Sequence, residues 1–326
     1  MTRISRALVW AGLVVVALFA AVAGIGMGAV QLSPVEVWHA LTGEGDSTAI
    51  AVVRTLRLPR VALGALVGVA LGMSGGALQG SLRNPLAEPY LLGVSGGAAV
   101  GASIAFVLGA PFAAVPLAAF GGANNAVGLA LLVARAGARS DPRVLLMAGV
   151  VVGAFANACI MVALANLSGN TIRNALWWMM GSVADASWMH VRWLALYVVL
   201  TGSALIVWAR QIDLLALGED TAAGLGLDAD RAAPRIYLTA SLLAAATVAS
   251  AGLVGFVGLV VPHIARALGF RRHRGLLVAS ALAGAALVML ADVAARTLRP
   301  PAELPLGAVT ALIGVPFFLA RIRSVL

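Results

Sequence analysis

Lysine is absent from this 326-residue chain, so all 22 of its basic side chains are arginines. A nucleotide-hydrolysing P-loop needs a lysine that reaches the phosphates, and this chain therefore cannot supply that motif. Charged residues make up only 11% of the sequence, whereas soluble domains carry about 25%. With 61% hydrophobic residues, the natural solvent of the chain is the lipid bilayer. Any ATP-driven step must be powered by another subunit.

Several catalytic devices are also missing. The single cysteine, Cys159, excludes an intrachain disulfide. The four histidines show no metal-ligand spacing, so neither a metal nor a cofactor is expected. Two G-x-S-x-G matches, at Ser74 and Ser95, lie at the ends of apolar helices, whereas a nucleophile elbow follows a strand. We therefore do not expect the chain to be an enzyme.

The hydrophobic runs predict an all-α, polytopic membrane protein with one transmembrane domain over residues 1–326. A spanning helix needs about 20 apolar residues, and the run after Arg3 and Arg6 exceeds the core of about 7–15 residues in a signal peptide. It predicts a first span with a cytoplasmic N-terminus. Ten spans are expected, at residues 7–29, 61–82, 91–109, 114–134, 145–167, 190–209, 235–254, 255–270, 276–295 and 305–322.

The arginines indicate the orientation. An even number of spans places both termini on one side, and with that side cytoplasmic, 15 arginines lie inside and 7 outside. This is the bias expected from the positive-inside rule. The net charge of +9 is attributed to these loop arginines rather than to nucleic-acid binding.

Two connecting segments are unusually long. Residues 30–60 form an outer segment in which Ser33 and Pro34 match an N-cap followed by proline at the first helical position. Residues 211–234 form a cytoplasmic segment that holds five of the chain's 13 acidic residues. Because most loops between spans are short, this helix-prone elbow favours a partner site; a solvated connector is the alternative.

Acidic residues in the spans are few, and Asp292 is the notable one. It lies four residues before Arg296 on one helix face. An ionisable residue at such depth is a functional candidate, and a local Asp–Arg pair is the structural alternative.

Residues 57–98, RLPRVALGALVGVALGMSGGALQGSLRNPLAEPYLLGVSGGA, resemble the signature of the membrane permeases of type II ABC importers, which take up vitamin B12, haem and ferric siderophores. The similarity continues in LLMAGV (145–150), ALWWMMGSVADASW (175–188), LGEDTAAGLGLDADRAAPR (217–235), SAGLVGFVGLVVPHIAR (250–266) and ADVAARTLRPPAELPLGAVTALIGVPFF (291–318). It covers nearly the whole chain.

The resemblance implies a homodimer in the cell (inner) membrane, two ATPase subunits on its cytoplasmic side and a substrate-binding protein outside. It assigns three groups of residues. The residues expected to contact the ATPase are Gly218, Glu219, Ala222, Ala223, Leu225 and Gly226. Those expected to dock the binding protein are Arg57, Arg60 and Arg296. Those expected to form the cytoplasmic gate are Asn84, Leu86, Ser140 and Asp141.

Alternatives remain for each group and for the function. The docking arginines could merely anchor helix ends to lipid headgroups, and the proline-flanked RNPLAEP turn could be purely structural. An ion-gradient-driven secondary carrier would need membrane-embedded acids, which are scarce here. A scaffold protein would need neither the acidic elbow nor the outer arginines. Which chelate is carried is left open.

Overall fold

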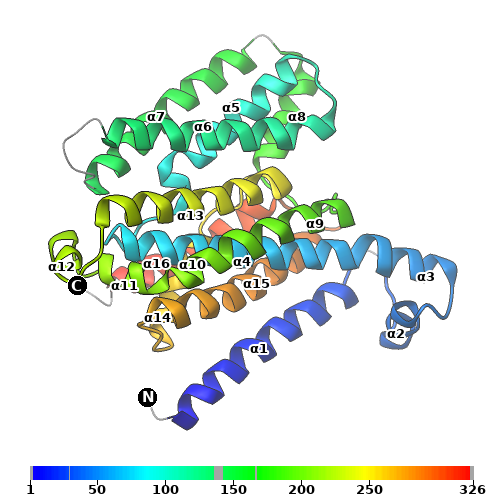
Figure 1. Cartoon of the computed structure of the whole chain (residues 1–326). Helices are drawn as coiled ribbons and strands as arrows, with labels where there is room; N and C mark the ends of the chain where they lie inside the picture. Colours follow the sequence, from blue (N-terminus) through cyan, green and yellow to red (C-terminus); the bar gives the residue numbers. More distant parts are fainter. Residues whose placement is uncertain (1–2, 29, 136–141, 166, 324–326) are drawn as a thin grey trace.

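The computed structural model describes residues 3–28, 30–135, 142–165 and 167–323. Over these residues the secondary structure is helical, with no strand, which confirms the all-α prediction. Figure 1 shows most of the long helices running along one common direction. The helices α2 and α3 lie at one end, the predicted outer end, and α11 and α12 lie at the other, the predicted cytoplasmic end.

Seven of the ten predicted spans correspond to helical segments long and apolar enough to cross a membrane. These are α1 (Arg3–Gly26), α4 (Leu58–Ser81), α6 (Val115–Arg135), α7 (Pro142–Leu164), α13 (Ala229–Ala251), α15 (His273–Thr297), and α9 (Trp188–Tyr197) continued through a π-helical turn at Val198–Gly202 into α10 (Ser203–Val207).

The other three predicted spans correspond to shorter apolar helices, α5 (Val94–Val107), α14 (Val257–Ala267) and α16 (Leu306–Arg323). At 1.5 Å per residue, the 11 residues of α14 reach only about 16 Å, roughly half of the hydrocarbon thickness of a bilayer. The segment predicted as the eighth span, 255–270, is therefore a half-length helix.

The segment predicted as the outer loop, residues 30–60, is largely helical. In α2 (Pro34–Thr42), Ser33 is the N-cap and Pro34 begins the helix, as predicted, and Glu36 completes a capping box with Ser33. The helix α3 (Ser47–Ala51) and a π-helical turn (Val52–Arg57) then lead directly into α4, so one helical segment of 35 residues runs from Ser47 to Ser81. That continuation and the separate helix α8 (Gly169–Met179) were not predicted.

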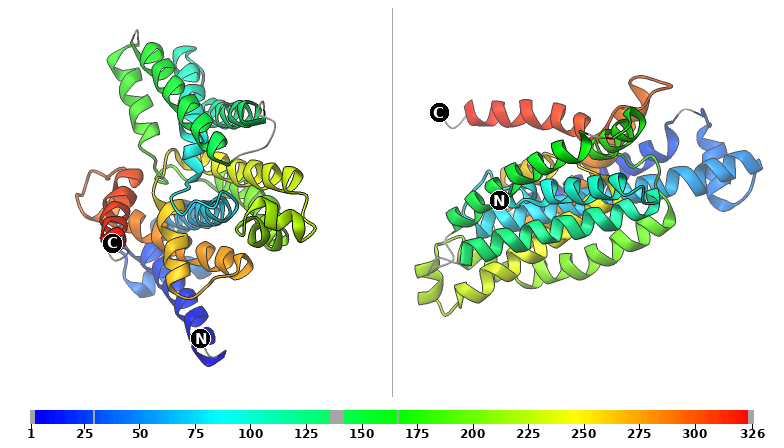
Figure 2. Two further views of the ribbon diagram at one scale, coloured as in Figure 1. Left: turned by 90° about the vertical axis from the view of Figure 1, so that its left-hand side faces the viewer. Right: turned by 90° about the horizontal axis from the view of Figure 1, so that it is seen from above.

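The helix α4 lies in the middle of the bundle, with α1 at its edge (Figure 2). Glycines bring the α4 backbone against its neighbours: a Cβ atom on Gly68 would lie 2.0 Å from the carbonyl oxygen of Gly284 in α15, and one on Gly75 would lie 1.9 Å from that of Gly258 in α14. Small residues permit such close packing of membrane helices. The helices α4, α14 and α15 are thus in direct backbone contact.

We predict that Gly68→Ala destabilises the protein by about 1–3 kcal/mol, because its methyl group would overlap the Gly284 carbonyl and force the two helices apart. Gly128→Ala in α6 is the matched control, since no atom lies within 4 Å of its added Cβ. Thermal unfolding followed by circular dichroism in detergent measures both. Equal midpoints for the two variants would contradict the packing described here.

Candidate functional site

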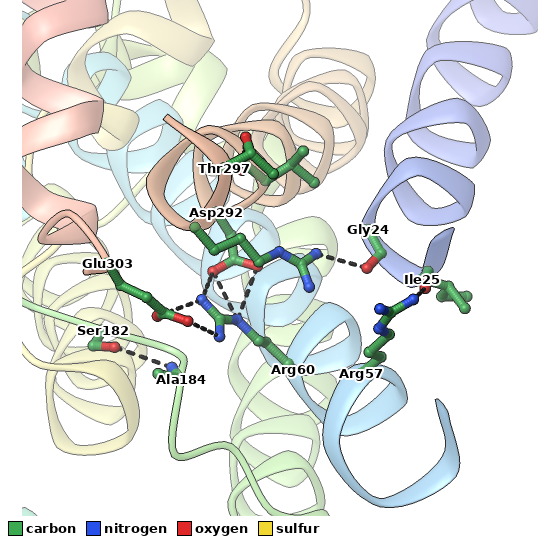
Figure 3. A network of polar contacts seen from close by, with 11 residues as sticks. Gly24, Ile25, Arg57, Arg60, Ser182, Ala184, Asp292, Thr297 and Glu303 are labelled. Atoms are coloured by element: carbon green, nitrogen blue, oxygen red, sulfur yellow. Dashed lines mark hydrogen bonds and ion pairs between the residues drawn. The ribbon is translucent and has the colours of Figure 1, made fainter. Parts of the chain in front are cut away.

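The three arginines predicted to dock a binding protein lie at the predicted outer ends of α4 and α15; Figure 3 labels Arg57 and Arg60 with their partners. Arg60 is their centre. Its Nε and Nη2 donate to Asp292 at 2.8–3.1 Å, and its Nη1 and Nη2 each donate to a carboxylate oxygen of Glu303 at 2.8 Å. One planar guanidinium therefore holds two carboxylates in fork-like geometry.

Arg57 and Arg296 are buried, with 4% and 8% of their surface exposed. Arg57 donates to the carbonyl oxygens of Ile25 (2.7 Å), Gly26 (2.9 Å) and Val30, and Arg296 donates to that of Gly24 (2.6 Å). The last four carbonyls of a helix have no partner within it. These two arginines therefore bind the C-terminal end of α1 to α4 and α15.

Asp292 is part of this network. It is 3% exposed and lies 3.5 Å from Arg296 Nε, so the local pair indicated by the sequence is present and Arg60 extends it. Glu303, in the loop between α15 and α16, was not singled out from the sequence. Its side chain is 40% exposed, and the donated hydrogen bonds of Arg60 lower its pKa although partial burial opposes this. Glu303 is thus the solvent-facing acid of the cluster.

The RNPLAEP turn lies at the opposite end of α4. Arg83 has φ +52°, and the side chain of Asn84 accepts a hydrogen bond from the backbone N–H of Leu86 at 2.9 Å. This is the local side-chain bond that stabilises turns at Asx residues. Leu86 is 51% exposed, so an apolar side chain projects from the turn. Of the four predicted gate residues, Ser140 and Asp141 lie outside the described residues.

The end of this turn is hydrogen-bonded to the loop of residues 252–256, which joins α13 to α14. Glu88 accepts a hydrogen bond from the backbone N–H of Phe256 at 2.9 Å. The hydroxyl of Tyr90 lies 3.1 Å from both the carbonyl oxygen and the N–H of Val254. Phe256 has φ +65°, an unusual value for a residue other than glycine. No sequence pattern indicates this attachment, because the partners in residues 254–256 are backbone groups.

The predicted coupling elbow consists of two short helices, α11 (Ala209–Leu215) and α12 (Glu219–Gly224). Gly218 and Gly226 flank α12 with φ +107° and +86°, values that favour glycine. Ala222 is buried, Glu219 and Gly218 are half-buried, and Ala223, Gly226 and Leu225 are exposed, Leu225 at 59%. The elbow therefore presents a small, partly apolar surface at the end of the bundle.

The elbow and the turn are neighbours. A Cβ atom on Gly218 would lie 3.5 Å from the guanidinium of Arg83, and one on Gly80 would overlap the side chains of His273 and Ile212. Asp213 of α11 accepts hydrogen bonds from the backbone N–H of His273, at 2.9 Å, and faces its Nδ1 at 2.6 Å. Burial raises the pKa of Asp213, but these bonds outweigh it, and the net shift is downward.

Among the described residues no cluster of three His, Cys, Asp or Glu side chains could hold a metal ion. The predicted site residues that the structure describes lie in two places: arginines and acids at one end of α4, and a turn with an adjoining elbow at the other.

Comparison with known proteins decides the family. The model of the FecCD transport family matches residues 13–324. The chain belongs to the FecCD transport family. It is 44% identical to the cobalamin import system permease of Halobacterium salinarum, over 85% of this chain and 74% of that one. It is 36% identical to the hemin transport system permease of Yersinia pestis, over 97% and 96%.

A solved ABC transporter assigned to the metal-chelate type, in an inward-facing conformation, shares this fold. Its TM-score is 0.88 at 28% identity, over 98% of this chain and 99% of that one. Together with the seven candidate spans, membership of the family makes the chain a multi-pass membrane protein and a transport permease.

We predict that Asp292→Asn lowers the free energy of unfolding by about 3–5 kcal/mol, because it leaves Arg60 and the buried Arg296 without their shared countercharge. Arg231→Ala serves as the control, since it removes only the exposed pair with Asp228, worth about 0–1 kcal/mol. Unfolding in mixed detergent–SDS micelles measures the difference. Similar losses in the two variants would argue against a structural role for the buried cluster.

Proposed function

We propose that the chain is the permease subunit of an ATP-driven importer that brings a metal chelate, either cobalamin, haem or a ferric siderophore, into the cytoplasm. The observation that carries the proposal is the match of residues 13–324 to a transport family whose relatives are named for such cargo. The permease would function as a homodimer in the cell (inner) membrane, with both termini cytoplasmic.

The energy would come from two ATPase subunits docked on the elbow, because the chain has no lysine for a P-loop of its own. The contact would involve Gly218, Glu219, Ala222, Ala223, Leu225 and Gly226. The glycines at both ends of α12 and the exposed side chain of Leu225 suit insertion of this short helix into a groove.

The inner gate would be the turn with Asn84 and Leu86, together with Ser140 and Asp141 between α6 and α7. Since Gly218 adjoins Arg83, a displacement of the elbow by the ATPase would reach the turn directly. The gate would then move together with the end of α4.

The binding protein would dock on the outer arginine cluster, and Arg60 is the member best placed to receive it. Arg57 and Arg296 already hold backbone carbonyls of α1 and would support the site from within. Glu303 is partly exposed where it pairs with Arg60, so a carboxylate of the partner could take its place on the same guanidinium.

A secondary carrier driven by an ion gradient finds no support in the comparisons, whose named relatives are permeases of import systems. The structure adds a physical argument. Asp292, the acid noted within a span, is hydrogen-bonded to Arg60 and lies next to Arg296, so its carboxylate is engaged in contacts within the protein.

The proposal is tested by uptake into proteoliposomes that contain the chain and its cognate ATPase, with cobalamin, haem and ferric siderophores each supplied with its binding protein. We expect ATP-dependent accumulation of one chelate. Accumulation driven by an ion gradient in vesicles that contain the chain alone would overturn the importer and favour the secondary carrier.

For docking, we predict that Arg60→Ala weakens binding of the cognate binding protein at least tenfold, whereas Glu303→Gln strengthens it because Arg60 loses a competing carboxylate. Glu44→Gln is the matched control, since it removes one exposed negative charge from the same predicted outer side of the protein, away from Arg60. Affinity is measured by titration calorimetry on the permease in nanodiscs. No change in Arg60→Ala, or equal effects of the two glutamine variants, would exclude Arg60 as the docking contact.

A further inference from the structure

A second arginine cluster lies at the predicted cytoplasmic ends of α1 and α15, apart from the docking, gate and elbow residues. It surrounds a hollow of about 370 Å³ lined by Arg6, Trp10, Phe270, Arg271, Arg272 and Arg274. The rings of Trp10 and Phe270 lie 4.6 Å apart and supply its apolar part. Four arginines, from α1, from α15 and from the segment between α14 and α15, thus line one concave surface.

These arginines have little compensation from acids. All four are exposed. The side chains of Arg6, Arg271 and Arg274 make no hydrogen bond or ion pair with another residue in the described part of the chain. Asp213 is the acid that interacts with Arg272, and its carboxylate already accepts the hydrogen bonds of His273. The arginines that line the hollow therefore outnumber the acid beside them, and the net charge of its lining is positive.

The start of α15 adds to this potential. This helix has 25 residues and no acidic residue in its first turn, and Arg272 and Arg274 flank its first residue. Positive side chains at a helix N-terminus are unfavourable, because the helix dipole is positive there. An anion bound among these arginines would remove the repulsion.

The position of the hollow indicates where the anion comes from. It lies where α1 packs on α15, and α1 is the peripheral helix whose membrane-spanning window is only 11% buried (Figure 2). Tryptophan beside arginine at a helix end is typical of the membrane–water interface. Basic pockets between membrane helices bind the headgroups of anionic lipids, and the planar fork of arginine matches phosphate oxygens.

We propose that this hollow binds the phosphate group of an anionic phospholipid, with Trp10 and Phe270 packed beside the glycerol and upper acyl region. The lipid would hold the N-terminal end of the edge helix α1 against α15, whereas Arg57 and Arg296 bind its C-terminal end. A second hollow, of about 550 Å³, shares Arg272 and Arg274 and adds Arg210 and the acid Asp213, so three arginines and one carboxylate line the side next to the proposed headgroup site. The proposal does not depend on the cargo of the permease.

The test measures binding of fluorescent phosphatidylglycerol to the full-length protein in a zwitterionic detergent, with phosphatidylcholine, phosphatidylglycerol and inorganic phosphate as competitors. We expect unlabelled phosphatidylglycerol to compete at least tenfold better than either of the others. Equal competition by phosphatidylcholine would mean that the site does not distinguish an anionic headgroup from a zwitterionic one. Equal competition by inorganic phosphate would mean a site for a soluble anion, and either result overturns the proposal.

Variants separate a site from general attraction. Arg272→Gln combined with Arg274→Gln should weaken phosphatidylglycerol binding at least tenfold. Arg83→Gln combined with Arg231→Gln removes the same charge from exposed residues of the same predicted side that do not line either hollow, and should leave binding nearly unchanged. Equal losses in both pairs would overturn the proposal. Arg272→Lys with Arg274→Lys keeps the charge without the fork and should restore binding only in part; thermal midpoints in lipid-free detergent verify that each variant is folded.

Discussion

The helix α4 touches α14 and α15 through backbone atoms, and this close contact holds the central helices of the bundle in place. At Gly68 and Gly75 no side chain separates α4 from the carbonyl oxygens of Gly284 and Gly258. Helices at this distance cannot slide past each other without losing dispersion contacts along their length. α4, α14 and α15 therefore act as one body, and both ends of that body carry the polar groups to which function is assigned.

The two ends of this body use different chemistry. At the predicted outer end, Arg60 is shared by two carboxylates, and Arg57 and Arg296 complete the C-terminus of α1, so a cluster of charges is satisfied largely within the protein. At the other end, close packing at Gly80 and the Asp213–His273 contact join α4 to the elbow. Glu88 and Tyr90 extend the connection to the break between α13 and α14. The elbow and the turn are thus joined through packed atoms, and the proposed coupling rests on this contact.

The parts of this arrangement that the sequence predicted are those with a local signal. Apolar runs located the seven long and three shorter apolar helices, Ser33 and Pro34 marked the start of α2, and glycines with acidic residues marked the elbow. What was missed depends on partners far apart in the chain. Arg60 meets Asp292 and Glu303 across 232 and 243 positions, and Arg57 binds carbonyl oxygens, which leave no trace in the side-chain pattern. The helical extension from Ser47 was missed because Arg54 and Arg57 interrupt its apolar residues. The helix α8 was missed because its first half, GNTIRN, is polar.

If the turn and the elbow of one chain move as a unit, the distance between them stays constant when ATP binds. Spin labels at Leu86 and Leu225, both exposed, in a Cys159→Ser background and diluted into unlabelled chain, report the separation of turn and elbow by pulsed electron resonance. The assembled transporter is measured without nucleotide and with ATP trapped. We expect the same narrow distance distribution without nucleotide and with ATP trapped. A shift or a second population with ATP would show that the elbow moves relative to the turn and would contradict this expectation.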